Sequence, residues 1–235
     1  MNNRKNPSAA AFSAIPWKKR AANYVWPRYS ATLDKVNYNA LLKKWIKENC
    51  GVPILPDRFA LYEFVQREYL KGEPICLLEF GVYKGESIFK WAEINVHSNS
   101  RFVGFDSFSG LPEDWNSLLR KGAFDVAGAA PKTDDVRIAF VKGLFQDTLR
   151  NFLKEFQCDK RLVVHNDSDL YSSTDYCLSE LDKVLLPGSI IIFDEFNSVL
   201  SEFRAWNDYL RSFMRKAKPI GVTVDYAQQA AFLFE

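Results

Sequence analysis

Two acidic segments, each directly after a short apolar run, constrain the fold of this chain more than any other feature. The segment 167–169 (DSD) follows the run 161–165, and the segment 194–195 (DE) follows the run 189–193. Runs of this length between turn-forming residues are typical of buried strands in a parallel sheet. Because open α/β sheets bind ligands beyond the carboxyl ends of their strands, we expect both acidic segments to face one cleft. Crowded carboxylates raise one another's pKa, and a divalent cation with oxygen ligands would relieve the repulsion. The pattern therefore predicts metal-assisted chemistry.

From residue 75 onward, short apolar runs alternate with longer helical patterns. The expected strands are 75–80, 102–105, 137–141, 162–165, 190–193, 220–224 and 230–234, and the expected helices are 86–94, 148–156, 174–184 and 202–215. Such alternation predicts βαβ units, and hence an α/β fold with a mostly parallel sheet. We expect seven strands with helices on both faces, and the last two strands form an antiparallel hairpin that gives the sheet an antiparallel edge strand.

The N-terminal region differs from the rest of the chain in pattern and in charge. Two helices are expected at 36–48 and 57–70, the second with Asp57 as its N-cap. We predict a basic N-terminal arm and helical extension at 1–71, acting as a cap or a dimer contact, and a ligand-binding domain at 72–235. Six basic and no acidic residues precede Asp34, so a chain of net charge +2 carries −4 beyond that arm.

This charge distribution argues against nucleic-acid binding by the main domain. The arm itself has the charge to meet nucleic acid, a membrane surface or an acidic substrate, but a solvated, partly ordered extension is the favoured interpretation. Pro16 and Pro27 disfavour an organellar presequence, since they interrupt an amphipathic helix. No apolar stretch approaches the roughly 20 residues that span a bilayer, so no membrane segment is expected. The four cysteines are scattered and form no C-x-x-C pair, which indicates reduced thiols in a cytoplasmic protein.

A long segment without clear helix or strand pattern, residues 107–135, interrupts the alternation. Loops of this length are uncommon inside a domain and are usually lids, binding loops or disordered segments. The apolar side chains Trp115, Leu118, Phe124 and Val126 argue against disorder. We expect a lid over the cleft, with an extra helix at 113–120 as the alternative.

The turn after the first expected strand is built for close approach of a ligand. Gly81 and Gly85 allow a tight turn, and the helix that follows points its N-terminus at the same place. Glu79 occupies the first glycine position of the dinucleotide-binding fingerprint, which disfavours NAD and suits an ammonium group or hydroxyls. Asp106, at the end of the second expected strand, stands where a ribose-hydroxyl acceptor is usual. Together these four residues describe a pocket that fits S-adenosylmethionine.

Six strings between residues 75 and 196, about half of the chain, resemble the successive motifs of the macrocin O-methyltransferase family in order and spacing. They are LLEFGVYKGES, FVGFDSFSGLPEDW, KGAF, VKGLFQDTL, HNDSDLYSST and LLPGSIIIFDEF. The resemblance implies a Rossmann-like fold of class I methyltransferases, dependence on S-adenosylmethionine, and methylation of hydroxyls, notably on sugars of natural products. The first string also resembles the corresponding turn of catechol O-methyltransferases, another magnesium-dependent group.

The resemblance also implies roles for individual residues. The cofactor's methionine end would be lined by Glu79, Gly81, Tyr83 and Ser87, and its ribose by Asp106 with Ser107 nearby.

Asp167, Asp194 and Glu195 would match the family's metal ligands, and Asp169 its proposed general base. Two departures stand out, because the family usually has a second aspartate in place of Glu195 and an aliphatic residue in place of Asn166.

Some of these residues have structural readings that stay open. Asp169 is suited to capping the helix expected at 174–184, and His165 is either an alternative base or a hydrogen-bonded core residue.

The sequence thus predicts an O-methyltransferase that uses S-adenosylmethionine and Mg²⁺ to methylate a hydroxyl of a sugar or another small polyhydroxylated metabolite. A homodimer is a further expectation. The alternatives are another metal-dependent enzyme using the same cleft, and a non-catalytic homologue that binds S-adenosylmethionine.

Overall fold

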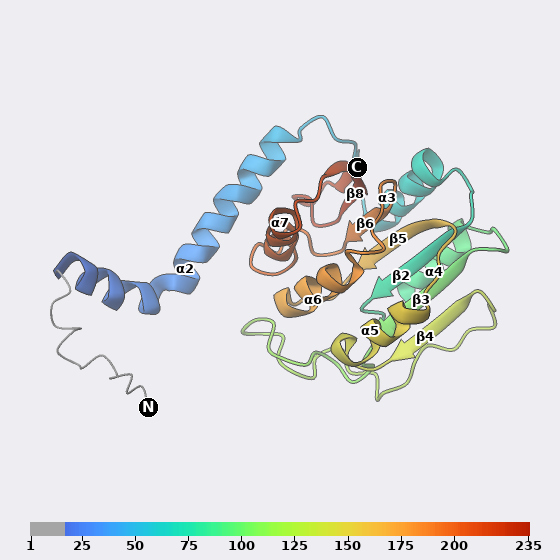
Figure 1. Cartoon of the computed structure of the whole chain (residues 1–235), viewed down its shortest axis with the longest axis horizontal. Helices are drawn as coiled ribbons and strands as arrows, with labels where there is room; N and C mark the ends of the chain where they lie inside the picture. The colour runs from blue at the N-terminus through green and yellow to red at the C-terminus, as the bar shows by residue number, and fades with distance from the viewer. Residues whose placement is uncertain (1–16) are drawn as a thin grey trace, which may run out of the picture.

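The computed structural model describes residues 17–235, which form one sheet flanked by helices (Figure 1). The strands are β1 (Ile54–Leu55), β2 (Ile75–Phe80), β3 (Arg101–Asp106), β4 (Ile138–Lys142), β5 (Arg161–Asn166), β6 (Ile190–Phe193), β7 (Ala217–Thr223) and β8 (Ala230–Phe234). The helices are α2 (Trp17–Glu48), α3 (Arg58–Val65), the π-helix η1 (Gln66–Leu70), α4 (Glu86–Ile94), α5 (Phe145–Glu155), α6 (Tyr171–Leu181) and α7 (Glu202–Ser212).

The sheet order is β1-β7-β8-β6-β5-β2-β3-β4. All neighbours from β6 through β5, β2 and β3 to β4 pair in parallel, as predicted, and β8 pairs antiparallel with both β6 and β7. The predicted hairpin of the last two strands is therefore present. The antiparallel strand β8 lies between β7 and β6 rather than at the edge, because β7 lies outside it.

The described part of the chain has eight strands where we predicted seven. The additional strand, β1, has only two residues and pairs in parallel with β7. The backbone N–H groups of Val222 and Val224 donate to the carbonyl oxygens of Pro53 and Leu55, at 3.0 and 2.9 Å. A two-residue strand carries no period-2 pattern, and the prolines on either side of it read as loop.

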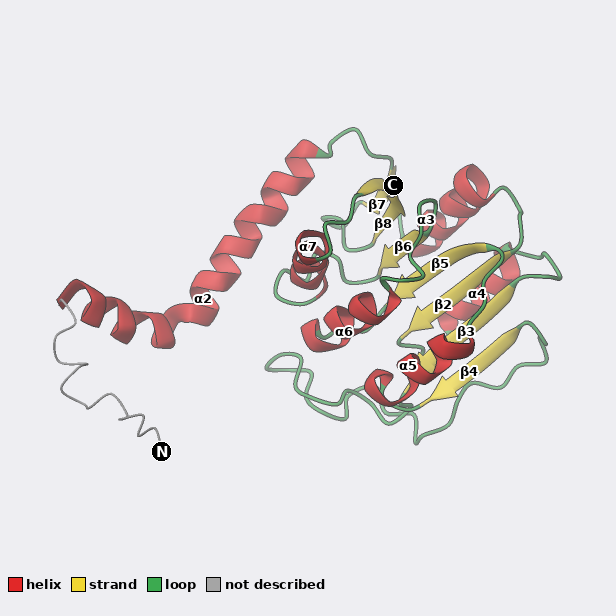
Figure 2. Ribbon diagram, viewed as in Figure 1, coloured by secondary structure: helices red, strands yellow, loops and turns green. Residues whose placement is uncertain are grey.

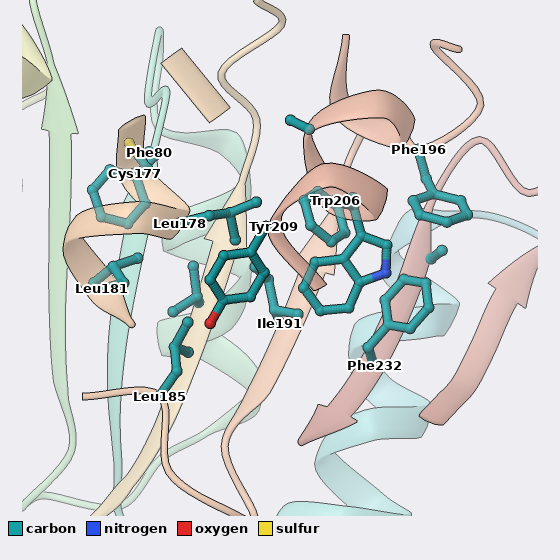
Figure 3. Packing of buried hydrophobic residues seen from close by; sticks show 14 of the residues in the cluster. Phe80, Cys177, Leu178, Leu181, Leu185, Ile191, Phe196, Trp206, Tyr209 and Phe232 are labelled. Carbon is teal, nitrogen blue, oxygen red and sulfur yellow. The ribbon is translucent and has the colours of Figure 1, made fainter. Parts of the chain in front are cut away.

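Alternation along the strands divides the core into two layers. In β2, Leu78 and Phe80 face a cluster covered by α5, α6, α7 and the C-terminal part of α2. Ile75 and Leu77 face the opposite cluster, covered by α3, η1 and α4. Helices thus cover both faces of the sheet, as predicted (Figure 2). Figure 3 shows the first cluster.

α2 begins at Trp17, well before the predicted start at residue 36. The helix continues through Pro27, and Figure 1 shows its N-terminal part extending away from the sheet. Its C-terminal part docks on the core, where Leu42 is buried and the Trp45 ring lies 4.9 Å from that of Phe196. The first sixteen residues of the predicted basic arm lie outside the described residues. Within residues 17–235, no helix has both the length and the apolar character to cross a bilayer.

The second N-terminal helix belongs to the packed layers. Asp57 is the N-cap of α3, as predicted, and its side chain accepts a hydrogen bond from the Ala60 N–H at 2.9 Å. Leu61, Tyr62 and Val65 are fully buried against the sheet. The boundary at 71/72 stays a prediction.

Candidate active site

A cavity of about 260 Å³ lies at the carboxyl ends of β2, β3, β5 and β6. Eight of the residues predicted from the sequence line it: Gly81, Tyr83, Asp106, Ser107, Asp167, Asp169, Asp194 and Glu195. The structure therefore brings both acidic segments and the glycine turn into one cleft. Glu79, Gly85 and Ser87 do not line the cavity.

The glycine turn packs directly against the first acidic segment. Gly81 has φ of +91°, and a Cβ built on it would lie 1.9 Å from the carbonyl oxygen of Asp167. The Gly81 N–H donates to the carbonyl oxygen of Phe105 at 3.0 Å. Only glycine satisfies both the left-handed backbone and this contact. Gly85, with φ of +84°, shapes the same turn as the N-cap residue of α4.

Asp106 joins the end of β3 to the glycine turn. Its Oδ2 accepts hydrogen bonds from the N–H groups of Val82 and Tyr83, both at 2.8 Å. Its Oδ1 accepts from the Phe108 N–H at 2.7 Å. Asp106 thus orders the turn and lines the cavity. Since a carboxylate has about four lone-pair sites, it retains acceptor capacity for a ligand hydroxyl.

Glu79 lies beneath the cavity wall. Its carboxylate is fully buried, with Oε2 at 3.2 Å from Nδ1 of His165 and Oε1 without a hydrogen-bond partner. Burial raises the pKa of Glu79, and the hydrogen bond to His165 opposes that rise. The Tyr62 hydroxyl lies 2.9 Å from Nε2 of His165. His165 is therefore a hydrogen-bonded core histidine here, and Glu79 is its buried partner.

Ser87 is also buried, in the first turn of α4. Neither Glu79 nor Ser87 is among the lining residues, and the contact with the methionine end that the resemblance implied for both stays a prediction. Sequence spacing places both next to the turn, whereas the direction of each side chain depends on packing of α3 and α4 on the sheet.

Asp169 has the electrostatics of a group that exchanges protons near neutral pH. Burial raises its pKa to about 7, and the nearby charges of Glu195, Asp194 and Asp106 act in the same direction. Its backbone has φ of +60°, in the left-handed region that non-glycine residues seldom adopt. Such strain is often retained at functional sites.

The other acidic side chains are crowded as the sequence predicted. Burial, and then the charges of Asp194 and Asp169, hold the pKa of Asp167 well above its usual range. Oδ1 of Asp194 is buried without a hydrogen-bond partner, and its Oδ2 lies 3.9 Å from Nη1 of Arg58. Burial raises the pKa of Glu195, which accepts a hydrogen bond from Nε2 of Gln228 at 3.1 Å.

These carboxylates fit a cation in chemistry but not in arrangement. An orphaned carboxylate oxygen and mutually repelling acids are the donors that a hard cation such as Mg²⁺ prefers. Within residues 17–235, however, no three His, Cys, Asp or Glu side chains are grouped closely enough to hold a metal ion. Asp167, Asp194 and Glu195 have the donor chemistry of a cation site but not, among the described residues, the close grouping of three ligands.

The long segment 107–135 contributes part of the cavity wall. It contains no helix at 113–120, so the alternative of an extra helix does not apply. Hydrogen bonds between Leu111 and the pair Gly122 and Ala123, each 2.9 Å, fold the loop on itself. Nε1 of Trp115 donates to Oγ of Ser201 at 3.2 Å, which ties the loop to the start of α7. The wall residues from this loop are Ser107, Gly110, Leu111, Pro112, Trp115 and Phe124.

Sequence reasoning missed three parts of this site. Residues 143–146, which join β4 to the first turn of α5, line the cavity, and the Gly143 N–H donates to the Asp106 carbonyl oxygen at 2.9 Å. Arg58 brings a positive charge from α3, and Glu202 lies buried at the start of α7. The string VKGLFQDTL marked the first of these without assigning it a role. Nothing in the local sequence marks Arg58 or Glu202, because their contacts are made across the fold.

The sheet order, with an antiparallel strand inserted beside β6, and the cleft above β2 and β3 define the Rossmann-like fold of class I methyltransferases. A family model described as macrocin-O-methyltransferase (TylF) matches residues 59–227. The chain belongs to this family.

A curated relative from Streptomyces olivaceus is 8-demethyl-8-(2,3-dimethoxy-alpha-L-rhamnosyl)-tetracenomycin-C 4'-O-methyltransferase. It is 30% identical over 145 residues, which cover 53% of this chain and 54% of the relative. The chain thus spans about half the length of this curated relative.

Two solved structures share the fold. The calicheamicin methyltransferase CalS11 matches with a TM-score of 0.58 and 19% identity, over 99% of each chain. The O-methyltransferase NovP matches with a TM-score of 0.60 and 20% identity, over 75% of this chain and 78% of its own.

Proposed function

We propose that this protein is an S-adenosylmethionine-dependent O-methyltransferase that methylates a hydroxyl of a sugar or another small hydroxylated metabolite. Family membership supports the reaction class, and the curated relative is named for methylation of a rhamnosyl group. The observation that carries the proposal is the shared cavity: Asp169, with a pKa of about 7, faces the same space as the glycine turn at Gly81.

In this proposal the glycine turn and β3 hold the cofactor. Gly81 lines the cavity while its α-carbon packs against the Asp167 backbone, and Asp106 and Ser107 offer acceptors to the ribose. S-adenosylmethionine supplies the electrophilic methyl group when bound. Holding the acceptor oxygen in line with that group is the largest contribution the cavity makes, since orientation alone lowers a barrier by about 7–11 kcal/mol.

Asp169 would accept the proton of the acceptor hydroxyl at one of its carboxylate oxygens. A base with a pKa close to the working pH combines a useful ionised fraction with sufficient basicity. Such catalysis contributes about 10²–10⁴-fold. Trp115 and Phe124 from the segment 107–135 form part of the wall of the same cavity.

We further propose that Mg²⁺ assists the reaction, and this proposal rests only on the carboxylate oxygens that the cleft offers as ligands. Asp167, Asp194 and Glu195 would hold the cation, whose charge would lower the pKa of the acceptor hydroxyl. The orphaned Oδ1 of Asp194 supports this, and the absence of a three-ligand grouping among residues 17–235 weighs against it. Chelation with EDTA tests it, because undiminished turnover would remove the metal from the mechanism.

Two measurements test the function as a whole. Calorimetry with S-adenosylhomocysteine should detect binding, and a mass-spectrometric screen of glycosides and sugar nucleotides should find a product heavier by one methyl group. A different metal-dependent enzyme in this cleft would ignore S-adenosylhomocysteine. A non-catalytic homologue would bind it and yield no product, and either result contradicts the proposal.

We also propose a homodimer and a cytoplasmic location. The four free cysteines are compatible with a reducing compartment. The half-exposed apolar side chains Leu33 and Val36 on α2 offer a surface for a second copy. Light scattering at the elution peak should give twice the monomer mass, and a monomer mass would contradict the dimer.

A further inference from the structure

The geometry points to Glu202 as a positioning residue that holds the two acidic segments in register for methyl transfer. Glu202 does not line the cavity and lies fully buried in the first turn of α7. The inference has a structural half, that Glu202 fixes the geometry of the two segments, and a catalytic half, that this geometry is needed for methyl transfer. Only the catalytic half rests on the proposed function.

The two oxygens of Glu202 bridge the ends of two strands. Oε1 accepts a hydrogen bond from Nδ2 of Asn166, the last residue of β5, at 2.8 Å. Oε2 accepts from the backbone N–H of Glu195, just beyond β6, at 2.9 Å. One side chain from α7 therefore fixes the residue before the first acidic segment and the backbone of the second.

The bridge extends into the first acidic segment. The Asn166 amide oxygen accepts from Oγ of Ser168 at 3.2 Å, and Ser168 lies 2.8 Å from Oγ1 of Thr174 in α6. Ser168 separates the two aspartates of its segment. The orientation of Asp167 and Asp169 thus depends on a hydrogen-bond network that starts at Glu202.

The position of Glu202 is costly for folding alone. Burial raises its pKa well above the usual range, and the charges of Asp169 and Asp194 add to that rise. A buried carboxyl among other acids destabilises the protein unless its hydrogen bonds offset the cost. The Glu195 N–H and the positive end of the α7 dipole supply part of the offset. An apolar residue would fill the core at lower cost but could not make these two hydrogen bonds, so positioning is the better explanation of a polar side chain here.

Glutamine and alanine at this position separate geometry from charge. In Glu202→Gln the amide oxygen can accept from the Glu195 N–H, while the amide nitrogen donates to Asn166 after that side chain flips. Glu202→Ala removes both contacts. Asn95→Ala is the matched control, since Asn95 is equally buried and hydrogen-bonded, to Gln66, Glu73 and Ser100, but follows α4 outside the cavity wall.

Hydrogen exchange by mass spectrometry tests the structural half without any ligand. Peptides covering 166–169 and 194–196 should exchange faster in Glu202→Ala than in the wild type, and at wild-type rates in Glu202→Gln and Asn95→Ala. Wild-type exchange at Glu195 in a folded Glu202→Ala variant would overturn the inference.

Kinetics with the acceptor found in the screen test the catalytic half. Glu202→Ala should lose on the order of tenfold to a hundredfold in kcat with an unchanged KM for S-adenosylmethionine, since small displacements of catalytic groups have effects of that size. Glu202→Gln should restore most of kcat, and Asn95→Ala should retain it. Unchanged kcat in Glu202→Ala, or no rescue by glutamine, would overturn the positioning role. A wild type that does not bind S-adenosylhomocysteine would instead contradict the proposed function, and the exchange data would still decide the structural half.

Discussion

A Cβ on Gly81 would lie 1.9 Å from the carbonyl oxygen of Asp167, so the glycine turn and the first acidic segment touch through their backbones. The Asp167 N–H also donates to the carbonyl oxygen of Phe80 at 2.8 Å. The part of the cleft that would hold the cofactor and the part that would activate the acceptor are therefore in direct backbone contact. A change that displaces the glycine turn should also displace the segment 167–169.

Gly81→Ala should abolish binding of S-adenosylhomocysteine. The methyl group cannot be accommodated against a backbone carbonyl at that distance, and φ of +91° is strained for alanine. Calorimetry measures the loss. Gly72→Ala is the control, because Gly72 also has positive φ, of +77°, but a methyl group added to it would meet no atom within 4 Å. Equal binding by the Gly81 and Gly72 variants would contradict the role of the turn.

Asp169→Asn should lower kcat by about 10²–10⁴-fold and leave S-adenosylhomocysteine binding intact. In the wild type, kcat should rise with pH through a midpoint near 7, because the raised pKa of Asp169 keeps the base protonated at lower pH. The variant should lose this limb of the pH profile. Asp134→Asn, at an exposed position outside the cavity wall, should keep it. A variant at 169 with the wild-type profile would show that another group is the base.

Leu42→Ala tests whether α2 is part of the folded core. Leu42 is 1% exposed among residues of the first cluster, and such truncations cost about 2–5 kcal/mol. Lys43→Ala, at the neighbouring exposed position of the same helix, should change the free energy of unfolding by no more than about 0.5 kcal/mol. Urea unfolding measures both. Equal, small effects would mean that α2 docks only weakly.

The sequence predicted the elements whose pattern is local. β6 and β8 have the predicted bounds, and so does α4, because runs such as IIIF and the glycine at its N-cap carry their own signal. The N-terminal half of α2 was missed since it shows no apolar periodicity to mark a helix, and β1 was missed since its partner is distant in the chain.

For the site too, the sequence predicted the positions that follow from local pattern and missed the contacts made across the fold. Strand ends placed Asp106, Asp167 and Asp194 correctly in one cleft, because parallel strands end at one edge. Alternation along β2 places Glu79 on the face of Ile75 and Leu77. Its contact with His165, which also contacts Tyr62, was not predictable, since it joins three elements.

Arg58→Met should shift the pH dependence of kcat toward higher pH. Nη1 of Arg58 lies 3.9 Å from Oδ2 of Asp194, in a cleft where the remaining charges are mostly carboxylates. Burial and the charges of Glu195 and Asp194 already raise the pKa of Asp169, so removing a cation close to these carboxylates should raise it further. Methionine keeps the apolar stem that packs on Phe59, while a pH–rate profile reads out the charge.

Arg67→Met is the control, since Arg67 pairs with Glu68 on the exposed side of η1. Because partial exposure of Arg58 screens its charge, the expected shift is well under that of a fully buried pair. A shift to lower pH, or one that Arg67→Met reproduces, would mean that the charge of Arg58 does not act on the catalytic base.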